Sequence, residues 1–222
     1  MDKHAIEQIA TALAHEVKNP LSLVAANVKL LEQSDPLAEN KKNYKTIQNE
    51  LLKINDIIMQ FLTIATPVAQ DFFELVYISD VLIEIIEKYQ HSYPNISFEM
   101  FNFVFNYKDP AVLGNESSLI MLFNNIIKNA IEALEKSGSI TIFMNEDLEH
   151  SLLKITIVDN GPGLSEKAKR MSEVSNNFTT KNFGTGLGLG ICNKIAKEHD
   201  GSFSIKNGKT VGCIVNVTLP VV

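Results

Sequence analysis

The stretch Val158–Asp159–Asn160–Gly161–Pro162–Gly163 follows an alternating segment, Leu152–Ile157, that predicts a β-strand. This strand would deliver Asp159 to a turn in which two glycines remove side chains and permit positive φ angles. An acidic side chain at such a turn can read the edge of a nucleobase. Asp-x-Gly-x-Gly is also common in ordinary turns, so the stretch does not identify a nucleotide site by itself.

A glycine run further along the chain supplies a second part of such a site. It reads Gly184–Thr185–Gly186–Leu187–Gly188–Leu189–Gly190 and precedes a helical pattern at Ile191, Ile195 and Ala196. Backbone N–H groups at a helix N-terminus can receive phosphate. The spacing is not that of a P-loop, and no ribose-reading acid follows as in a dinucleotide-binding unit. The two stretches together predict a nucleotide site.

Composition and charge limit the classes of function. The 222 residues are 45% hydrophobic and 21% charged, which is ordinary for a globular protein. The net charge of −6 argues against a nucleic-acid surface, which would usually be basic. Cys192 and Cys213 lack metal-ligand spacing, so we expect two reduced, partly buried thiols. Without a signal peptide or a long apolar run, we expect a cytoplasmic chain, or the cytoplasmic part of a longer one, with no membrane contact of its own.

The first part of the chain predicts two long helices. Apolar residues recur at spacings of three and four over residues 6–33, and over 37–65 they form a narrow heptad seam. His15 falls opposite the first apolar stripe, with Glu16 and Asn19 on the same polar side. Pro20 should bend this helix one turn later. Such a hairpin has too little core to stand alone, so we expect a homodimer paired as a four-helix bundle.

The most informative helix of the remaining chain is predicted over 119–134, beyond a linker at 67–72. Four polar residues share one of its faces: Asn125, Lys128, Asn129 and Glu132. A merely solvated face would favour Glu, Lys and Arg, because Asn is a mediocre helix former. Amide oxygens can ligate a hard cation, so this face predicts a Mg²⁺–phosphate site.

The polar stretch 164–183 has the length and composition of a mobile lid. In it, Phe178 could cover a base, and Thr179, Thr180 and Lys181 could contact phosphates. The other expected elements are a helix over 75–89, a strand over 96–105, a hairpin of 139–143 with 152–158, a helix over 189–199 and strands over 202–205 and 213–219. They predict an α+β sandwich, a mixed sheet covered on one face by three helices.

Taken in order, these motifs resemble the catalytic core of a sensor histidine kinase of two-component systems. His-Glu-Val-Lys-Asn-Pro-Leu at 15–21 resembles the phosphoacceptor H box, and Asn-Ile-Ile-Lys-Asn-Ala-Ile-Glu-Ala at 125–133 resembles the N box. Residues 159–163 resemble the G1 box, and 178–181 and 184–189 resemble the F and G2 boxes. The residues of the N and F boxes are most similar to those of nitrogen-regulation and sporulation kinases.

The resemblance implies a helical hairpin for dimerisation and histidine phosphotransfer over 1–66 and a Bergerat-type ATP-binding domain over 73–222. His15 would be phosphorylated, Asn129 would hold Mg²⁺ and Asp159 would accept from the adenine amino group. Gly161 and Gly163 would line the base pocket. The phosphates would lie among Gly184, Thr185, Gly186, Leu187 and Gly188. The family often has Asp where Asn115 stands and Arg near Ser118, so the chain departs from the pattern there.

The implied function is an ATP-dependent autokinase that passes phosphate from His15 to an Asp of a response-regulator receiver domain. Glu16 would accept from the second ring nitrogen, and Lys128 and Lys181 would contact phosphates. Asn19 matches the position that orients water against a phosphorylated regulator, which predicts phosphatase activity as well. A separate sensory domain or partner protein would supply the signal. Two alternatives stay open: a phosphotransfer scaffold without ATP, and a Bergerat-type ATPase, which would need Glu where Asn125 stands.

Overall fold

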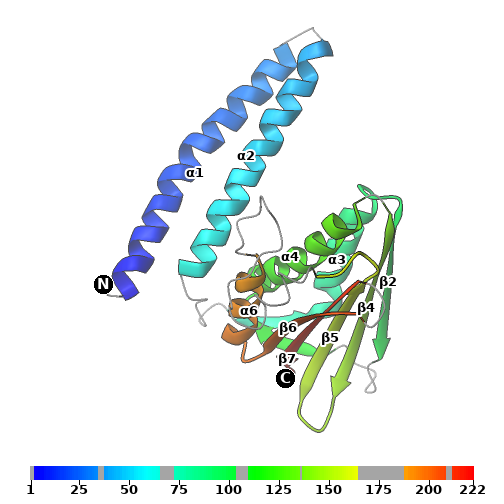
Figure 1. The fold of residues 1–222 in the computed structure, drawn as a ribbon. Coiled ribbons are helices and arrows are strands. Elements are labelled where there is room, and N and C mark those ends of the chain that lie inside the picture. Colours follow the sequence, from blue (N-terminus) through cyan, green and yellow to red (C-terminus); the bar gives the residue numbers. More distant parts are fainter. Residues whose placement is uncertain are drawn as a thin grey trace. The chain divides into compact units, whose positions relative to one another are not determined.

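The computed structural model describes residues 3–34, 38–65, 73–103, 110–135, 137–164, 188–208 and 212–222. Contacts between Cα atoms divide the chain into two compact units, Met1–Pro67 and Val68–Val222. Figure 1 shows the elements of both units. The first unit is wholly helical in its described part, and the second combines helices with β-sheet.

The first unit is a helical hairpin. Helices α1 (Lys3–Ser34) and α2 (Ala38–Ala65) pack along each other, which confirms the two predicted helices. Helix α1 continues through Pro20, so this proline does not end it. Gln48 Nε2 donates to Glu32 Oε2 at 2.8 Å and links the two helices. Among the side chains described here Val28 is buried, whereas Val17 and Val24 of the same predicted stripe remain 41% and 45% exposed.

The second unit is built on a mixed sheet with the strand order β2-β4-β5-β7-β6. Strands β2 and β4 are parallel and the other neighbours are antiparallel. The strand bounds are β2 Ile96–Phe103, β4 Gly138–Asp147, β5 Leu152–Asp159, β6 Ser202–Asn207 and β7 Cys213–Pro220. Three helices cover one face of this sheet: α3 Ile78–Gln90, α4 Glu116–Leu134 and α6 Gly188–Glu198. The predicted sandwich is confirmed.

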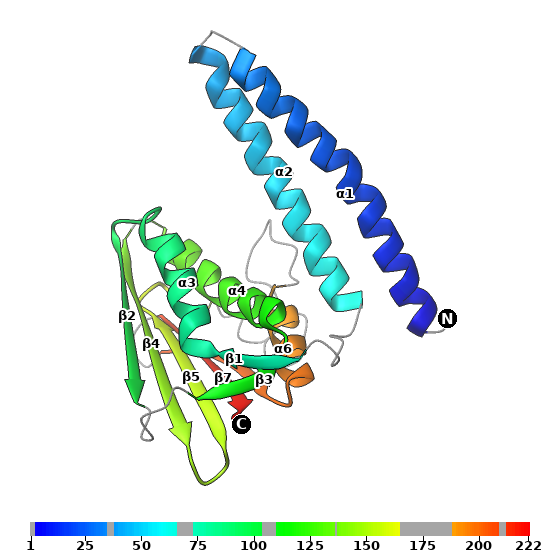
Figure 2. The ribbon, with the colours of Figure 1, turned by 180° about the vertical axis from the view of Figure 1, so that it is seen from behind.

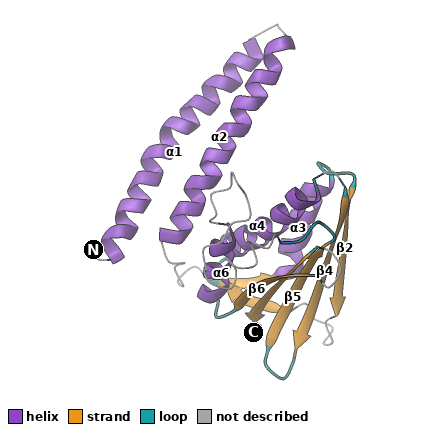
Figure 3. Ribbon diagram, viewed as in Figure 1, coloured by secondary structure: helices purple, strands orange, loops and turns teal. Residues whose placement is uncertain are grey.

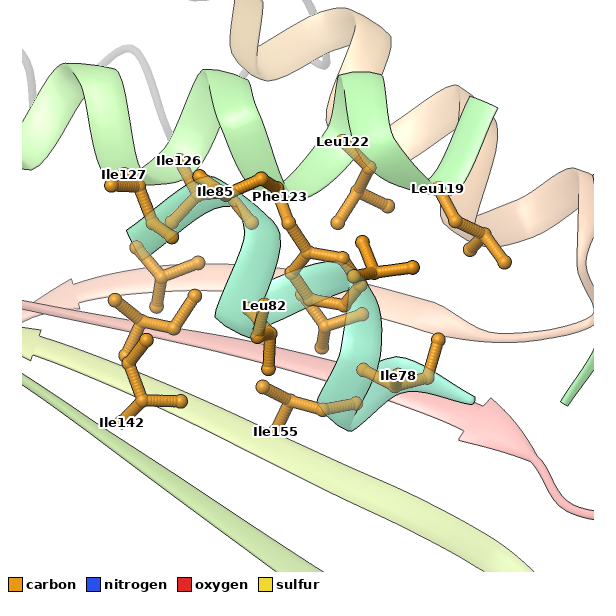
Figure 4. Close-up of a cluster of buried hydrophobic side chains, with 14 of the residues drawn as sticks. Ile78, Leu82, Ile85, Leu119, Leu122, Phe123, Ile126, Ile127, Ile142 and Ile155 are labelled. Carbon is orange, nitrogen blue, oxygen red and sulfur yellow. The ribbon is translucent and has the colours of Figure 1, made fainter. Parts of the chain in front are cut away.

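The core lies between the sheet and its helices, as Figure 4 shows. Alternate residues of each strand point to this face, because successive side chains of a strand point to opposite sides. Thus Ile140, Ile142 and Met144 of β4 are fully buried. They meet the apolar face predicted for α4, with Phe123 buried near the centre. The hairpin β4–β5, the helix α6 and the strands β6 and β7 all match predicted elements, within a few residues at the ends.

The prediction of a helix over 75–89 is wrong at its start. Residues Glu74–Tyr77 form strand β1, which pairs antiparallel with β3 (Ala111–Gly114), and α3 begins only at Ile78. Val76 is buried while Leu75 and Tyr77 are exposed, which is the alternation of a strand. The pairing with β3, an element that the sequence analysis missed, stabilises this conformation. Figure 3 distinguishes the strands from the helices by colour.

Candidate nucleotide-binding site

A buried carboxylate stands at the end of strand β5. The alternation of β5 places Leu153, Ile155 and Ile157 on the helix-covered face, and Asp159 follows on the same side with only 6% exposure. Its Oδ1 accepts from the backbone N–H of Gly161 at 2.9 Å and of Cys213 at 3.2 Å. These bonds offset the cost of burying a charged group. Within the described residues no hydrogen bond engages Oδ2, so that oxygen can accept from a ligand.

Glycines allow the backbone to close around this carboxylate. Gly163 has a φ of +77°, and a Cβ there would lie 3.0 Å from the carbonyl oxygen of Gly212. Gly212 has a φ of +79°, and its Cβ would lie 1.8 Å from the carbonyl oxygen of Asp159. Residues that carry a side chain rarely adopt such φ angles, and no side chain would fit at Gly212. The predicted turn at 159–163 is therefore packed directly against the start of β7.

The thiol of Cys213 lies beside the carboxylate. Burial, together with the negative charge of Asp159, raises the pKa of Cys213 to about 11, so the thiol stays protonated near neutral pH. Burial raises the pKa of Cys192 to about 12. Both cysteines are free, which confirms the predicted reduced thiols. Neither has the low pKa that a reactive cysteine requires.

The polar face of α4 carries the second group of predicted residues. Asn125, Lys128 and Asn129 are partly buried, and the amide nitrogen Nδ2 of Asn125 is buried with no hydrogen-bond partner in the described part of the chain. Gly188, the first residue of α6, faces this helix, since a Cβ there would lie 4.0 Å from Asn129 Nδ2. The structure therefore brings the N-box helix and the end of the glycine run together.

This arrangement fits a nucleotide. The open oxygen of Asp159 suits a base amino group, and the orphaned donor of Asn125 suits a phosphate oxygen. Among the described residues, no group of three or more His, Cys, Asp or Glu could hold a metal ion. The amide oxygen of Asn129 and phosphate oxygens are ligand types that Mg²⁺ accepts.

Several predicted residues cannot be placed in this geometry. Phe178, Thr180, Lys181, Gly184, Thr185, Gly186 and Leu187, together with most of the predicted lid, lie outside the described residues. His15 and Glu16 belong to α1 in the other unit, but their side chains are not among those described. Asn19 is exposed on α1, one turn after His15.

Two residues of the site escaped the sequence analysis. Gly212 and Cys213 reach Asp159 from the start of the last strand, 54 positions away for Cys213. The only sequence signal is the glycine that directly precedes the predicted strand 213–219.

Two protein families match consecutive parts of the chain. Residues 5–69 match the His Kinase A (phospho-acceptor) domain. Residues 114–222 match the histidine kinase-, DNA gyrase B- and HSP90-like ATPase. The chain belongs to the sensor histidine kinases. The second match includes every residue of the nucleotide site described above.

Known histidine kinases agree with this assignment. Sporulation kinase C of Bacillus subtilis (strain 168) is 32% identical over 219 residues, which are 96% of this chain and 48% of that protein. Full-length ShkA, solved in complex with AMPPNP, shares the fold with a TM-score of 0.77 and 19% identity, over 97% of this chain and 46% of that one. Histidine kinase ThkA, solved with the response regulator TrrA, shares the fold with a TM-score of 0.61 and 22% identity. The match covers 97% of this chain and 61% of the ThkA chain.

This kinase core spans less than half the length of the curated sporulation kinases that it matches. In the described part of the chain, no helix combines the length and the apolar character needed to cross a membrane.

Proposed function

We propose that this chain is an ATP-dependent autokinase that phosphorylates His15 and passes the phosphoryl group to an aspartate of a response-regulator receiver domain. One observation carries the proposal: a single chain joins a phospho-acceptor hairpin bearing His15 to a site where Asp159 and Asn125 each keep one hydrogen-bonding atom without a partner among the described residues. We assign residues 1–66 to the hairpin domain, 67–72 to a linker and 73–222 to the catalytic domain.

In this proposal ATP is held at both of its ends. Asp159 accepts from the adenine amino group, while Gly161 and Gly163 leave room for the ring. Asn125, Lys128, Lys181 and the glycine run from Gly184 to Gly188 surround the phosphates. Mg²⁺, held by Asn129 and phosphate oxygens, would neutralise part of their charge. Because ATP is the donor, we place the reaction in the cytoplasm.

The transfer requires an imidazole nitrogen aligned with the γ-phosphorus. His15 attacks this atom in line, an N–P bond forms, and the bond from phosphorus to the β–γ bridging oxygen breaks as ADP leaves. Glu16, the neighbouring carboxylate, accepts from the other ring nitrogen and stabilises the developing positive charge. Asn125 carries an amide where a water-activating glutamate would stand, and an amide cannot take a proton. Hydrolysis of ATP should therefore be slow, and replacing Asn125 by Glu should raise it.

Partner proteins follow from the same assignment. We propose a homodimer through the hairpin, which the exposed Val17, Val24 and Ile54 support. ThkA has been solved with a response regulator, and we propose a partner of that class here. Asn19 is exposed one turn after His15, where it could orient water against a phosphorylated regulator. A phosphatase activity of this kind would be lost in Asn19→Ala while autophosphorylation continued. A sensory domain or partner protein would supply the signal.

Incubation with γ-labelled ATP tests the kinase function. We expect protein-bound label that is acid-labile and base-stable, as a phosphohistidine is. The label should be absent from His15→Ala, which keeps the nucleotide site, and from Asp159→Asn, which keeps His15. Asp147→Asn, at a partly buried carboxylate on the β4–β5 hairpin that bonds Lys154 and His150, serves as the control and should be labelled normally.

The same experiment separates the alternatives. ATP binding without label, together with steady release of phosphate, would show an ATPase. The absence of both binding and label, with phosphate still accepted from another phosphoprotein, would show a phosphotransfer scaffold. Label that persists in His15→Ala would overturn the assignment of His15.

A further inference from the structure

The loop that carries the G1 glycines, residues 160–164, ends at a residue with its own small apolar cluster. Leu164 is 9% exposed and packs against Leu189 of α6, Ile205 of β6 and Cys213 of β7. Ile205 also packs against the main core, so this cluster adjoins it. The buried side chain of Leu164 therefore anchors the end of this loop.

An asparagine at the end of the edge strand β6 binds the backbone of Leu164. Asn207, the last residue of β6, accepts with Oδ1 from the Leu164 N–H at 2.6 Å. Its Nδ2 donates to the Leu164 carbonyl oxygen at 3.3 Å. The side-chain amide thus pairs with both backbone groups of one residue, as a neighbouring strand would do. We call this pair of bonds the Asn207 clamp.

The clamp belongs to a turn that contacts both ends of the G1 loop. Gly208 N–H donates to the Gly212 carbonyl oxygen at 2.9 Å and closes the turn between β6 and β7. From this turn, Cys213 N–H reaches Asp159 at the entrance of the loop. Asn207 reaches Leu164 at its exit, and a Cβ on Gly163 would lie 3.2 Å from Asn207 Oδ1. The turn therefore fixes the loop from one side.

We propose that Asn207 is a positioning residue for nucleotide binding: its clamp on Leu164 holds the G1 loop in the conformation that receives ATP. The proposal rests on ATP being the ligand of this site. Asn207 need not touch the nucleotide. It acts by removing the conformational freedom of Gly163 and Leu164 before the ligand arrives, and such preorganisation appears as affinity.

The clamp should therefore affect binding more than the chemical step. Two hydrogen bonds each contribute modestly to the order of the loop, and their combined loss corresponds to an affinity about tenfold weaker. We expect Asn207→Ala to raise the Kd and the KM for ATP by about tenfold. The kcat at saturating ATP should stay within about twofold of wild type, because bound ATP re-orders the loop.

Asn216 offers a matched control in the same sheet. It is a partly buried asparagine of β7 whose Oδ1 accepts from Thr156 Oγ1 at 3.0 Å. It alternates with the buried Val215 and Val217, so it lies on the sheet face opposite the helices. Asn216→Ala removes a comparable bond away from the G1 loop. Asn207→Asp and Asn216→Asp form a second, isosteric pair with equal added charge. At Asn207 the change replaces the donor with an oxygen that repels the Leu164 carbonyl.

The experiment measures ATP affinity by calorimetry, KM and kcat for autophosphorylation, and the thermal midpoint of the nucleotide-free chain for all four variants. The proposal expects weaker ATP binding in both Asn207 variants and wild-type binding in both Asn216 variants. Equal ATP affinity in a folded Asn207→Ala or Asn207→Asp chain would overturn it. An equal loss of ATP affinity in Asn207→Ala and Asn216→Ala chains with the same thermal midpoint would also overturn it. So would a fall in kcat without a rise in KM.

Hydrogen exchange at the Leu164 amide tests the clamp independently of ATP. The bond to Asn207 Oδ1 should protect this N–H in the wild-type chain, and the protection should be lost in Asn207→Ala but kept in Asn216→Ala. If the wild-type chain bound no ATP, the proposed function would be refuted, and hydrogen exchange at the Leu164 amide would still test the clamp. If ATP bound and the Leu164 amide exchanged equally in wild type and Asn207→Ala, only the clamp would be refuted.

Discussion

His199 is a buried histidine with both ring nitrogens engaged. It is 2% exposed and stacks on the ring of Phe73, with 4.8 Å between centroids. The backbone N–H of Asn115 donates to Nε2 at 3.1 Å, so Nε2 carries no proton. The proton is on Nδ1, which donates to the Ile195 carbonyl oxygen at 2.8 Å. Because charging the ring would require a second N–H facing that of Asn115, His199 is a neutral structural link between α6 and the start of α4.

Stability should depend on pH through this residue. Burial lowers the pKa of His199 below its ordinary value of 6.5. Well above pH 6.5 the ring is neutral in both the folded and unfolded chain, and the folded contacts contribute in full. As the pH falls below 6.5, the unfolded chain takes up a proton that the folded chain resists, so the free energy of unfolding decreases. Urea unfolding of the wild-type chain between pH 7.5 and 5.5 should show this decrease.

His199→Gln provides the comparison, because an amide can donate and accept at this place without titrating. Its unfolding free energy should change less over the same pH range than that of the wild-type chain. Parallel pH profiles for the two proteins would assign the effect to other groups. Asp147 does not interfere, since its hydrogen bonds from Lys154 and His150 lower its pKa and move its titration to more acidic pH.

Single residues differ in how far the sequence predicts their roles. Asp159 and its glycines were found because the motif is contiguous and follows a recognisable strand. Gly212 and Asn207 act on that motif from the turn between β6 and β7, more than forty positions later in the chain, and no local pattern shows which backbone they will meet. His199 looks like any histidine near a helix end, and its burial depends on Phe73, which lies on another segment.

At the scale of elements, helix α4 has a well-defined start. The side chain of Asn115 accepts from Ser118 N–H at 3.0 Å and caps the helix, while its own N–H donates to His199. An N-cap side chain satisfies one of the unpaired donors of the first turn. The chain has Asn where the family often has Asp, and both side chains offer the oxygen that the cap requires.

Replacing the cap tests its contribution. Asn115→Ala should reduce the free energy of unfolding by about 1 kcal/mol, the usual value of such a cap. Asn115→Asp should retain or slightly increase stability, because a negative charge near a helix N-terminus is favourable. Chemical unfolding of the three proteins at one pH measures both effects. An alanine variant as stable as the wild type would show that the cap contributes nothing.

Elements with a strong local periodicity were the predictable ones. Helices α1, α2 and α4 and the hairpin β4–β5 each repeat their apolar pattern several times. Strands β1 and β3 are four residues long, too short to repeat it, and they pair across more than thirty positions of the chain. Residues 75–77 were therefore predicted as part of the adjoining helix. Only the pairing with β3 shows that these residues form a strand and not the first turn of a helix.

At the scale of the molecule, the two units differ in how well they bury their own apolar residues. The catalytic unit has an extended core between sheet and helices. The hairpin leaves apolar residues exposed on both helices: Val17, Leu23, Val24, Leu30, Leu31, Ile47, Leu52, Ile54 and Ile57. Val17, Val24 and Leu31 recur every seven residues beside the buried Val28, which is the spacing of a bundle interface. This supports the proposed pairing of two hairpins.

The pairing can be tested with two neighbouring substitutions. Val24 lies one turn before Val28 on the same side of the helix. Leu23 points about 100° away from Val24 around the helix axis. A bundle interface beside Val28 would bury Val24 from each copy and leave Leu23 in solvent. Val24→Glu should then raise the dimer dissociation constant by at least about tenfold, because it removes apolar burial twice and brings two like charges together. Leu23→Glu should leave the constant nearly unchanged, although Leu23 is the more exposed at 66%. Sedimentation equilibrium over a range of concentrations measures both. A monomeric wild-type chain, or equal weakening by the two substitutions, would show that the apolar row is not the dimer interface.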